Sequence, residues 1–485
     1  MVIKHTTADD EPGSMDKTRH IQIECGKDAA KEFKFADGYV NLNHGSFGTY
    51  PTCLRPILRQ YQDASELQTD KFIRHDYPKL LDQSREALAN YLNAPTEACV
   101  FVPNATTGLN TVLRALVYEP GDVIVYFSTI YGACEKTVEY LTETTPVTSV
   151  KITNFTYPDP SSNDEHLSKL FEDAISSIKA EGKKAKLAIF DTVSSLPGVR
   201  VPFERLTDIC REHGILSCID GAHGVGHIPL DLSELDPDFF FSNCHKWLHV
   251  PRGCAVLYVP VRNQHLIRST LPTSHGFTPL PQPGKAGIHN VMAVAGKSAF
   301  VANFDFVGTI DDSPYLCVPA AIEWRGRLTW QGKSGEAAIM SYTHDLAARG
   351  GARMASLLGT STMIPAESGT NFSNVLVPLD YATVTGKAEF EFATAVKVAA
   401  WMSDKIMHHH NTFLALYIHG EKWWVRVSSQ VYLTLESYEY GAKIARGSVA
   451  PAVGVASPSN RYRRRKEAAP ISDGIQAAAE HANRH

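Results

Sequence analysis

Short apolar runs alternate with amphipathic stretches through the middle of this chain, and the alternation limits the folds that it can adopt. The runs are rich in β-branched and aromatic residues, and amphipathic stretches such as Phe203–His213 separate them. The runs fall at Val123–Phe127, Leu187–Phe190, Leu216–Ile219, Phe239–Phe241 and Ala255–Val259. Strands that are apolar throughout are buried on both faces, so the pattern predicts an α/β fold with a mainly parallel sheet between helices.

Two of these runs end close to residues that can do chemistry. Leu216–Ile219 is followed by Asp220, and Phe239–Phe241 leads to Lys246. Ligands bind at the carboxyl ends of the strands in such sheets, so we expect both side chains in one crevice. An Asp or a Lys alone is more often part of a surface salt bridge. A buried lysine is costly unless it is neutral or covalently engaged, and a Schiff-base lysine with an aspartate for the ring nitrogen is what pyridoxal 5′-phosphate (PLP) requires.

A segment suited to phosphate precedes this pair. After the apolar entry Phe101-Val102, the chain reads Pro103-Asn104-Ala105-Thr106-Thr107-Gly108 and continues in a helical pattern over Leu109–Leu116. Free N–H groups at a helix N-terminus bind anions, although an ordinary helix N-cap would also account for this sequence. The nearby aspartate and lysine favour the interpretation as a phosphate cup.

Together, these motifs resemble the class V, fold-type I aminotransferase superfamily over about residues 38–445. The resemblance is strongest to the isopenicillin N epimerase-like branch, which includes the fungal hercynylcysteine sulfoxide lyases of ergothioneine biosynthesis. It implies a large domain with a mostly parallel seven-stranded sheet and a smaller α+β C-terminal domain. The motifs that carry it are Leu42-Asn43-His44-Gly45-Ser46-Phe47-Gly48, Asp220-Gly221-Ala222-His223 and His245-Lys246-Trp247, followed by Pro251-Arg252-Gly253.

The resemblance also implies roles for individual residues. Lys246 would carry PLP as a Schiff base, Asp220 would pair with the pyridine nitrogen, and His223 with Ser195 would bind the ring 3-hydroxyl. Arg426 would clamp the substrate carboxylate, as a planar guanidinium does well, with Asn43 and His44 also at the substrate. Tyr131 would stack on the cofactor, and we weigh equally that its hydroxyl also protonates the leaving group. The phosphate would be held by Ala105, Thr106, Asn243 and His245, and by Gly308 and Thr309 of a second subunit in a homodimer.

The residue types leave the outcome of the reaction open. Loss of a sulfur group at Cβ makes a carbon–sulfur lyase, return of a proton to the other face makes an epimerase, and hydrolysis makes a transaminase. Overall resemblance favours the lyase, with hercynylcysteine sulfoxide as substrate. No cysteine follows Cys317, so a persulfide mechanism lacks its nucleophile. The presence of the lysine, aspartate, cup and arginine argues against a non-catalytic scaffold.

Composition and the chain ends set the remaining expectations. A net charge of −5 argues against nucleic-acid binding, and nine scattered cysteines favour a cytoplasmic protein. The sequence contains no run of about 18 apolar residues, so we expect no membrane span. His408-His409-His410 reads as a polar loop rather than a metal site. We expect a loose polar leader over 1–34, a large domain over 35–314 and a small domain over 315–447. Low complexity after Ala445 predicts a short or missing final helix, then a disordered tail over 448–485.

Overall fold

The computed structural model describes residues 21–159, 161–284, 290–292, 296–364 and 369–452, and its centre is a seven-stranded sheet. The strand order is β2-β8-β7-β6-β5-β3-β4, and β8 alone runs against the others. The predicted mostly parallel sheet is therefore confirmed. The strands are β2 (Cys99–Val102), β3 (Asp122–Phe127), β4 (Thr148–Ile152), β5 (Lys184–Asp191), β6 (Leu216–Asp220), β7 (Phe239–Ser242) and β8 (Ala255–Tyr258).

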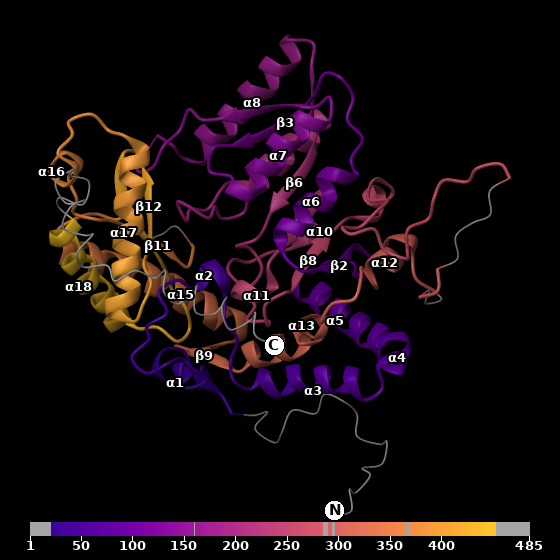
Figure 1. Ribbon diagram of the computed structural model, residues 1–485, viewed down its shortest axis with the longest axis horizontal. Helices are drawn as coiled ribbons and strands as arrows, with labels where there is room; N and C mark the ends of the chain where they lie inside the picture. Colours follow the sequence, from indigo (N-terminus) through magenta and orange to yellow (C-terminus); the bar gives the residue numbers. More distant parts are fainter. Residues whose placement is uncertain (1–20, 160, 285–289, 293–295, 365–368, 453–485) are drawn as a thin grey trace, which may run out of the picture.

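Helices connect the parallel strands and cover the sheet (Figure 1). Helix α6 begins after Asn104, whose side chain accepts a hydrogen bond from the Thr107 amide at 2.8 Å. Helix α9 has the predicted bounds and ends at Gly214, which adopts a left-handed conformation. The helices of this part are α3 (Leu54–Leu67), α4 (Thr69–Lys71), α5 (Tyr77–Tyr91), α6 (Ala105–Ala115), α7 (Gly132–Thr144), α8 (Asp164–Ala180), α9 (Phe203–His213), α10 (Leu232–Leu235), α11 (Cys244–Trp247) and α12 (Ala299–Phe304).

The C-terminal part is built on a three-stranded antiparallel sheet in the order β11-β13-β12. It lies on the left of Figure 1, beside α17 and α18. Its strands are β11 (Phe372–Leu376), β12 (Ala415–His419) and β13 (Lys422–Ser428). Its helices are α13 (Ser313–Leu316), α14 (Val318–Gly326), α15 (Gly335–Leu358), α16 (Tyr381–Thr385), α17 (Phe392–His410) and α18 (Leu435–Ala452).

Three predictions from the sequence were wrong, for the final helix, for the three consecutive histidines and for the N-terminal segment. The final helix α18 is neither short nor missing, because Tyr438, Ala442 and Ile444 bury one of its faces. The three histidines His408–His410 form the last turn of α17 rather than a loop.

Residues 21–34 are also not a loose leader. They contain β1 (Ile23–Glu24), which pairs with β9 (Leu328–Trp330), and α1 (Lys27–Ala30), and they bury Ala29 and Phe33. Strand β10 (Lys333–Ser334) completes this second small sheet. Residues 1–20 and 453–485, on which the rest of the leader and most of the tail fall, lie outside the described residues. Within the described ranges, no helix is long and apolar enough to cross a bilayer.

Candidate active site

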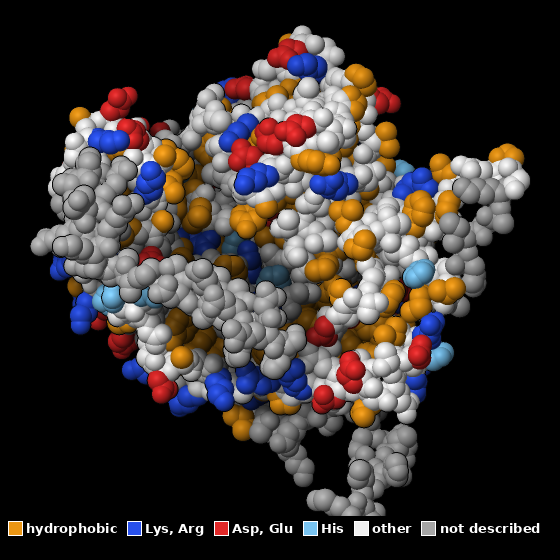
Figure 2. Space-filling view, viewed as in Figure 1, with side chains coloured by type: hydrophobic (Ala, Val, Ile, Leu, Met, Phe, Trp, Pro, Cys, Tyr) orange, Lys and Arg blue, Asp and Glu red, His pale blue; other side chains and the backbone are white. Residues whose placement is uncertain are grey.

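Polar side chains converge where strands β5, β6 and β7 end. Strand β5 ends at Asp191 and β6 at Asp220, and these two residues are register partners across the parallel pair. Strand β7 leads into the short helix α11, which carries Lys246. Figure 2 shows a hollow between the two parts of the molecule, with Lys or Arg and His side chains at its floor. Asp220 and Lys246, which the sequence places in one crevice, therefore lie close enough at the predicted edge of the sheet to shift each other's pKa.

Lys246 is surrounded by groups of both charges. Burial and the nearby Arg426 guanidinium lower the pKa of its amine to about 8, although Asp220 and Asp191 oppose that shift. Its Nζ lies 3.2 Å from Nε2 of His223. A lysine with this pKa is partly neutral near neutral pH, which is the form that attacks a carbonyl carbon or accepts a proton.

Asp220 keeps few hydrogen-bond donors for a buried carboxylate. Its Oδ1 accepts from the Ala222 amide at 2.9 Å, and its Oδ2 lies 3.5 Å from the Cys134 thiol. Burial raises the pKa of Asp220, and burial together with the Asp220 charge raises that of Asp191 well above its ordinary value. Two adjacent buried carboxylates with so few donors are stabilised by a cationic or protonated partner, such as a protonated ring nitrogen.

The first turn of α6 lies against the loop that carries Lys246. The Ala105 amide donates to Oδ1 of Asn243 at 2.9 Å, so two residues predicted for the phosphate are joined directly. Thr106 lies in the same turn. His245 donates from Nδ1 to the Cys254 carbonyl at 2.9 Å, which leaves Nε2 for another partner. Burial lowers the His245 pKa to about 4, and a bound dianion would favour the protonated ring that can donate to it.

Arg426 lies on β13 and reaches across to two other segments of the chain. Its guanidinium donates to the Ser195 carbonyl at 2.6 Å, to Oγ of Ser46 at 2.9 Å and to Oδ1 of Asn43 at 3.2 Å. It also lies 4.5 Å above the Phe372 ring. These acceptors are all neutral, and the buried Nε has no partner within the described residues. Burial lowers the Arg426 pKa to about 10.

A second buried arginine shows what Arg426 lacks. Arg325 has no exposed surface, and its Nε donates to Oε1 of Glu336 at 2.6 Å as part of a two-point ion pair. Arg426 is 2% exposed, and among the residues that the structure describes its hydrogen-bond partners include no such carboxylate. A buried guanidinium among neutral acceptors still requires an anion, so Arg426 is suited to bind the carboxylate of a ligand.

His44 and Ser195 both contact protein groups around Lys246 and Arg426. Both ring nitrogens of the buried His44 contact protein, Nε2 at 2.7 Å from the Lys246 carbonyl and Nδ1 at 2.9 Å from the Tyr432 hydroxyl. The ring therefore positions the backbone of Lys246, and no nitrogen is left for a substrate. The Ser195 carbonyl and hydroxyl lie 2.6 and 3.5 Å from the Arg426 guanidinium, and the role of Ser195 toward the ring 3-hydroxyl stays a prediction.

In the part of the chain that the structure describes, no hydrogen bond joins the side chain of Tyr131 or Thr309 to the other predicted site residues. Tyr131 precedes α7 and is 49% exposed, so its ring is free to meet a ligand. Gly308 has a φ of 115° and Thr309 is exposed. Their assigned roles remain predictions.

Sequence reasoning missed Asp191 and the indole contact of Trp247. Asp191 directly follows the apolar run Leu187–Phe190, so the strand-end rule that selected Asp220 would also have selected it. The Trp247 Nε1 lies 3.1 Å from Nδ1 of His223. That contact depends on how a short helix turns after β7, and no spacing in the sequence encodes it.

Comparisons with known proteins agree with this geometry. The family model Aminotransferase class-V matches residues 58–307. L-cysteine desulfhydrase-like protein lolT1 of Epichloe uncinata is 35% identical over 86% of this chain and 94% of its own length. Hercynylcysteine sulfoxide lyase of Schizosaccharomyces pombe is 28% identical over 86% and 96%. The solved complex of the cystine C-S lyase C-DES with cysteine persulfide has a TM-score of 0.64, 17% identity and coverage of 84% and 98%.

Proposed function

The chain belongs to the class-V aminotransferase family, whose cofactor is PLP, and we propose from this premise that it is a carbon–sulfur lyase. Its substrate would be a cysteine-derived amino acid that loses its sulfur group by β-elimination. The observation that carries the proposal is the buried Arg426, whose guanidinium contacts neutral acceptors and lies close enough to Lys246 to lower its pKa, beside the Asp191–Asp220 pair.

The site fits PLP, as the chemistry of its side chains indicates. Lys246 would hold the cofactor covalently, Asp220 would hold the proton on its ring nitrogen, and the first turn of α6 with Asn243 would receive its phosphate. When bound, PLP supplies an electron sink for the charge left at the substrate Cα.

The remaining chemistry belongs to the chain. Arg426 binds the α-carboxylate, which fixes the Cα–H bond relative to Lys246. The Lys246 amine, neutral in part because of its lowered pKa, takes the Cα proton. The Cβ–S bond then breaks with its electron pair leaving on sulfur, and the released 2-aminoacrylate hydrolyses to pyruvate and ammonia.

Two substrates are put forward. The motifs favour hercynylcysteine sulfoxide, which would place the enzyme in ergothioneine biosynthesis. L-Cysteine is the second candidate, because the desulfhydrase-like relative shares more identity, 35% against 28%.

A product assay tests these proposals. Purified protein would be incubated separately with hercynylcysteine sulfoxide, L-cysteine and isopenicillin N, while pyruvate, sulfide, the thiol or thione product and substrate stereochemistry are followed. A higher kcat/KM for pyruvate from the sulfoxide supports the first substrate, and a higher value from L-cysteine supports the second. Epimerised isopenicillin N without pyruvate from either sulfur substrate would overturn the lyase assignment. The Lys246→Ala variant, prepared in the same way, is the negative control for each substrate.

We also propose a cytoplasmic homodimer in which Thr309 completes the partner's phosphate site. Mixing a Lys246→Ala subunit with a Thr309→Asp subunit tests it, because the mixed dimer contains one site with both native residues. Activity that returns on mixing supports the shared site. An active enzyme that sediments as a monomer in analytical ultracentrifugation would contradict the proposal. Proven mixed dimers that recover no activity would also contradict it.

A further inference from the structure

Trp247 follows the candidate Schiff-base lysine, and its ring contacts the histidine that faces that lysine. The indole Nε1 lies 3.1 Å from Nδ1 of His223, and Nε2 of His223 lies 3.2 Å from Nζ of Lys246. We propose that Trp247 is a positioning residue whose N–H fixes the tautomer of His223, so that the imidazole presents its Nε2–H to Lys246 and to the cofactor attached there. The inference rests on the proposed function of Lys246.

The argument follows from what each group can donate. An indole nitrogen is a donor only, so Nδ1 of His223 must be the acceptor and carries no proton. A neutral imidazole then carries its proton on Nε2, the atom that faces Lys246. Burial and the charges of Lys246 and Arg426 hold the pKa of His223 well below its ordinary value, which keeps the ring neutral.

This tautomer acts on the lysine. An ammonium group has no lone pair and cannot accept from the Nε2–H, whereas the neutral amine can. The contact therefore favours the neutral, nucleophilic form of Lys246. Once Lys246 is part of a Schiff base, the same N–H is available to an acceptor on the cofactor, such as an oxygen substituent of its ring.

Trp247 has little freedom to move. It is 1% exposed, and its ring centroid lies 4.4 Å from that of His227 and 5.3 Å from that of Phe372. Its carbonyl accepts a hydrogen bond from Arg325. A Cβ placed on Gly226 would lie 2.6 Å from the Trp247 backbone, so the chain passes here with no spare room. Contacts with both the backbone and the ring of Trp247 therefore fix the position of its indole.

Other charged or titratable groups face the pair. Asp191 on β5, Asp220 on β6 and Cys134 on α7 favour the ammonium form of Lys246, whereas Arg426 on β13 disfavours it. His227 also acts on the His223 pKa and lowers it. A test must hold these groups constant and change the indole N–H alone.

Trp247→Phe makes that change, with Trp423→Phe as its control. Trp423 is also 1% exposed, and its N–H donates to the Ala395 carbonyl at 3.0 Å, away from Lys246. The measurement is the rate at which the cofactor-free full-length protein captures PLP covalently, as a function of pH. Without the indole N–H, Nε2 can accept from the ammonium group, so the midpoint should rise by about one pH unit relative to the wild-type protein. Trp423→Phe should keep the wild-type midpoint, and a Trp247→Phe midpoint equal to wild type would overturn the inference.

Neutron diffraction from crystals of the cofactor-loaded wild-type enzyme gives a second test that needs no variant. A deuteron on Nε2 of His223 and none on Nδ1 is the expected result, and a deuteron on Nδ1 refutes the inference even if Trp247→Phe does not fold. Borohydride reduction and peptide mapping separate this from the proposed function. A cofactor found on a residue other than Lys246 would refute that function, whereas one found on Lys246 beside an Nδ1-protonated His223 would refute only the role of Trp247.

Discussion

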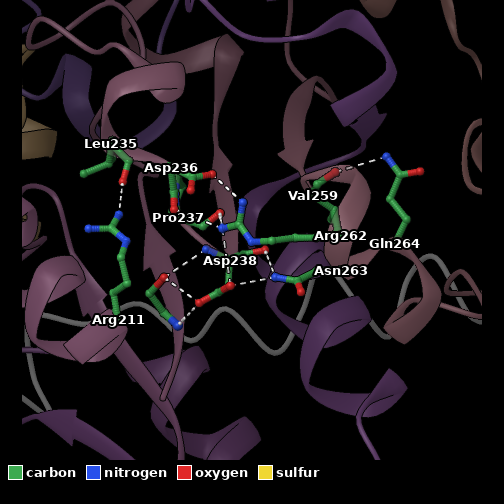
Figure 3. Close-up of polar contacts among 10 residues, drawn as sticks. Arg211, Leu235, Asp236, Pro237, Asp238, Val259, Arg262, Asn263 and Gln264 are labelled. Atoms are coloured by element: carbon green, nitrogen blue, oxygen red, sulfur yellow. Dashed lines mark hydrogen bonds and ion pairs between the residues drawn. The ribbon is translucent and has the colours of Figure 1, made fainter. Parts of the chain in front are cut away.

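Strands β6 and β7 carry polar side chains at both ends, and the two ends supply them with very different numbers of partners. At the amino end, Oδ1 of Asp238 accepts from Asn263 at 2.7 Å and from Arg262 at 3.4 Å (Figure 3). Its Oδ2 accepts from the amide of Ser217 at 3.0 Å and from the hydroxyl of the same residue at 3.2 Å. Arg262 also pairs with Asp236. Each oxygen of Asp238 thus has two donors.

At the carboxyl end, the same strands hold their charges with fewer donors. Within the described residues, each oxygen of Asp220 accepts one hydrogen bond, from an amide at 2.9 Å and from a thiol at 3.5 Å. A carboxylate with all its hydrogen bonds made stabilises the fold, whereas a buried one with few donors costs stability and has oxygen lone pairs left to accept from a ligand. The polar groups that stabilise the fold therefore lie at the amino ends of β6 and β7, and those proposed for catalysis lie at the carboxyl ends.

Lys246→Ala should have the largest effect of any change at the carboxyl end. Turnover and covalent attachment of PLP should both disappear, because the proposed proton acceptor and point of attachment are lost. The cofactor-free variant should still unfold in a cooperative transition, which separates loss of the attachment point from loss of the fold. Absorbance spectroscopy and calorimetry measure the two properties. A variant that keeps its yellow colour after dialysis would contradict the assignment of Lys246.

Asp220→Asn should leave PLP attached but lower kcat by roughly 100- to 1000-fold, the scale for losing one preorganised electrostatic group. The amide cannot hold a proton on the ring nitrogen through charge. Steady-state kinetics and solvent exchange of the α-hydrogen measure the effect. Near wild-type exchange would mean that Asp191 or another group supplies that charge.

Tyr131→Phe separates two possible roles of an exposed ring at this end. If the hydroxyl is the acid for the departing sulfur group, product formation should fall about 100-fold while the α-hydrogen still exchanges with solvent deuterium. PLP affinity should stay unchanged, because the stacking plane is kept. Product formation at the wild-type rate would leave Tyr131 with stacking alone.

Arg426→Lys should cost about 1.5–3 kcal/mol in kcat/KM, because the charge remains but the two-point fork does not. The loss should appear for the substrate and not for PLP. Substrate kinetics and a PLP titration of the same preparation compare the two ligands. Normal substrate binding with weakened PLP binding would show that Arg426 serves the cofactor.

Asp238→Ala tests the amino end and should produce the reverse pattern. Removing this carboxylate leaves the donors of Ser217 and Asn263 without their partner, so the free energy of unfolding should fall by about 1–3 kcal/mol. The kcat of the folded protein should stay within twofold of wild type. Urea unfolding and kinetics at a temperature well below the transition measure both. A large loss of kcat in the folded variant would show that the two ends are coupled.

The same comparison explains how far the sequence could be interpreted. Asp220 and Lys246 could be predicted because the position of a residue at the end of an apolar run is a local property. The alternating runs gave the mostly parallel sheet for the same reason. The bounds of β5 were less certain, since its exposed first residue Lys184 precedes the apolar run and Asp191 extends it.

Features that depend on tertiary packing were not visible. Helix α18 is buried because one of its faces packs against α15 and α17. Its polar and small residues show no clear apolar stripe in the sequence, so that face could not be identified. His44 was expected at the substrate, and only the folded chain shows both its nitrogens engaged. The segment 21–34 is ordered because β1 pairs with β9, about 300 positions later in the chain.

The three-segment attachment of Arg426 has a consequence for biosynthesis. The residues proposed to hold PLP within one subunit lie between Ala105 and Lys246, so they are all translated within one stretch of the chain. The proposed carboxylate site is built from Asn43 and Ser46 near the start of the chain, Ser195 in the middle and Arg426 near the end. A nascent chain thus completes its cofactor residues about 180 codons before it gains the arginine that retains an amino acid, so incomplete chains lack a substrate site.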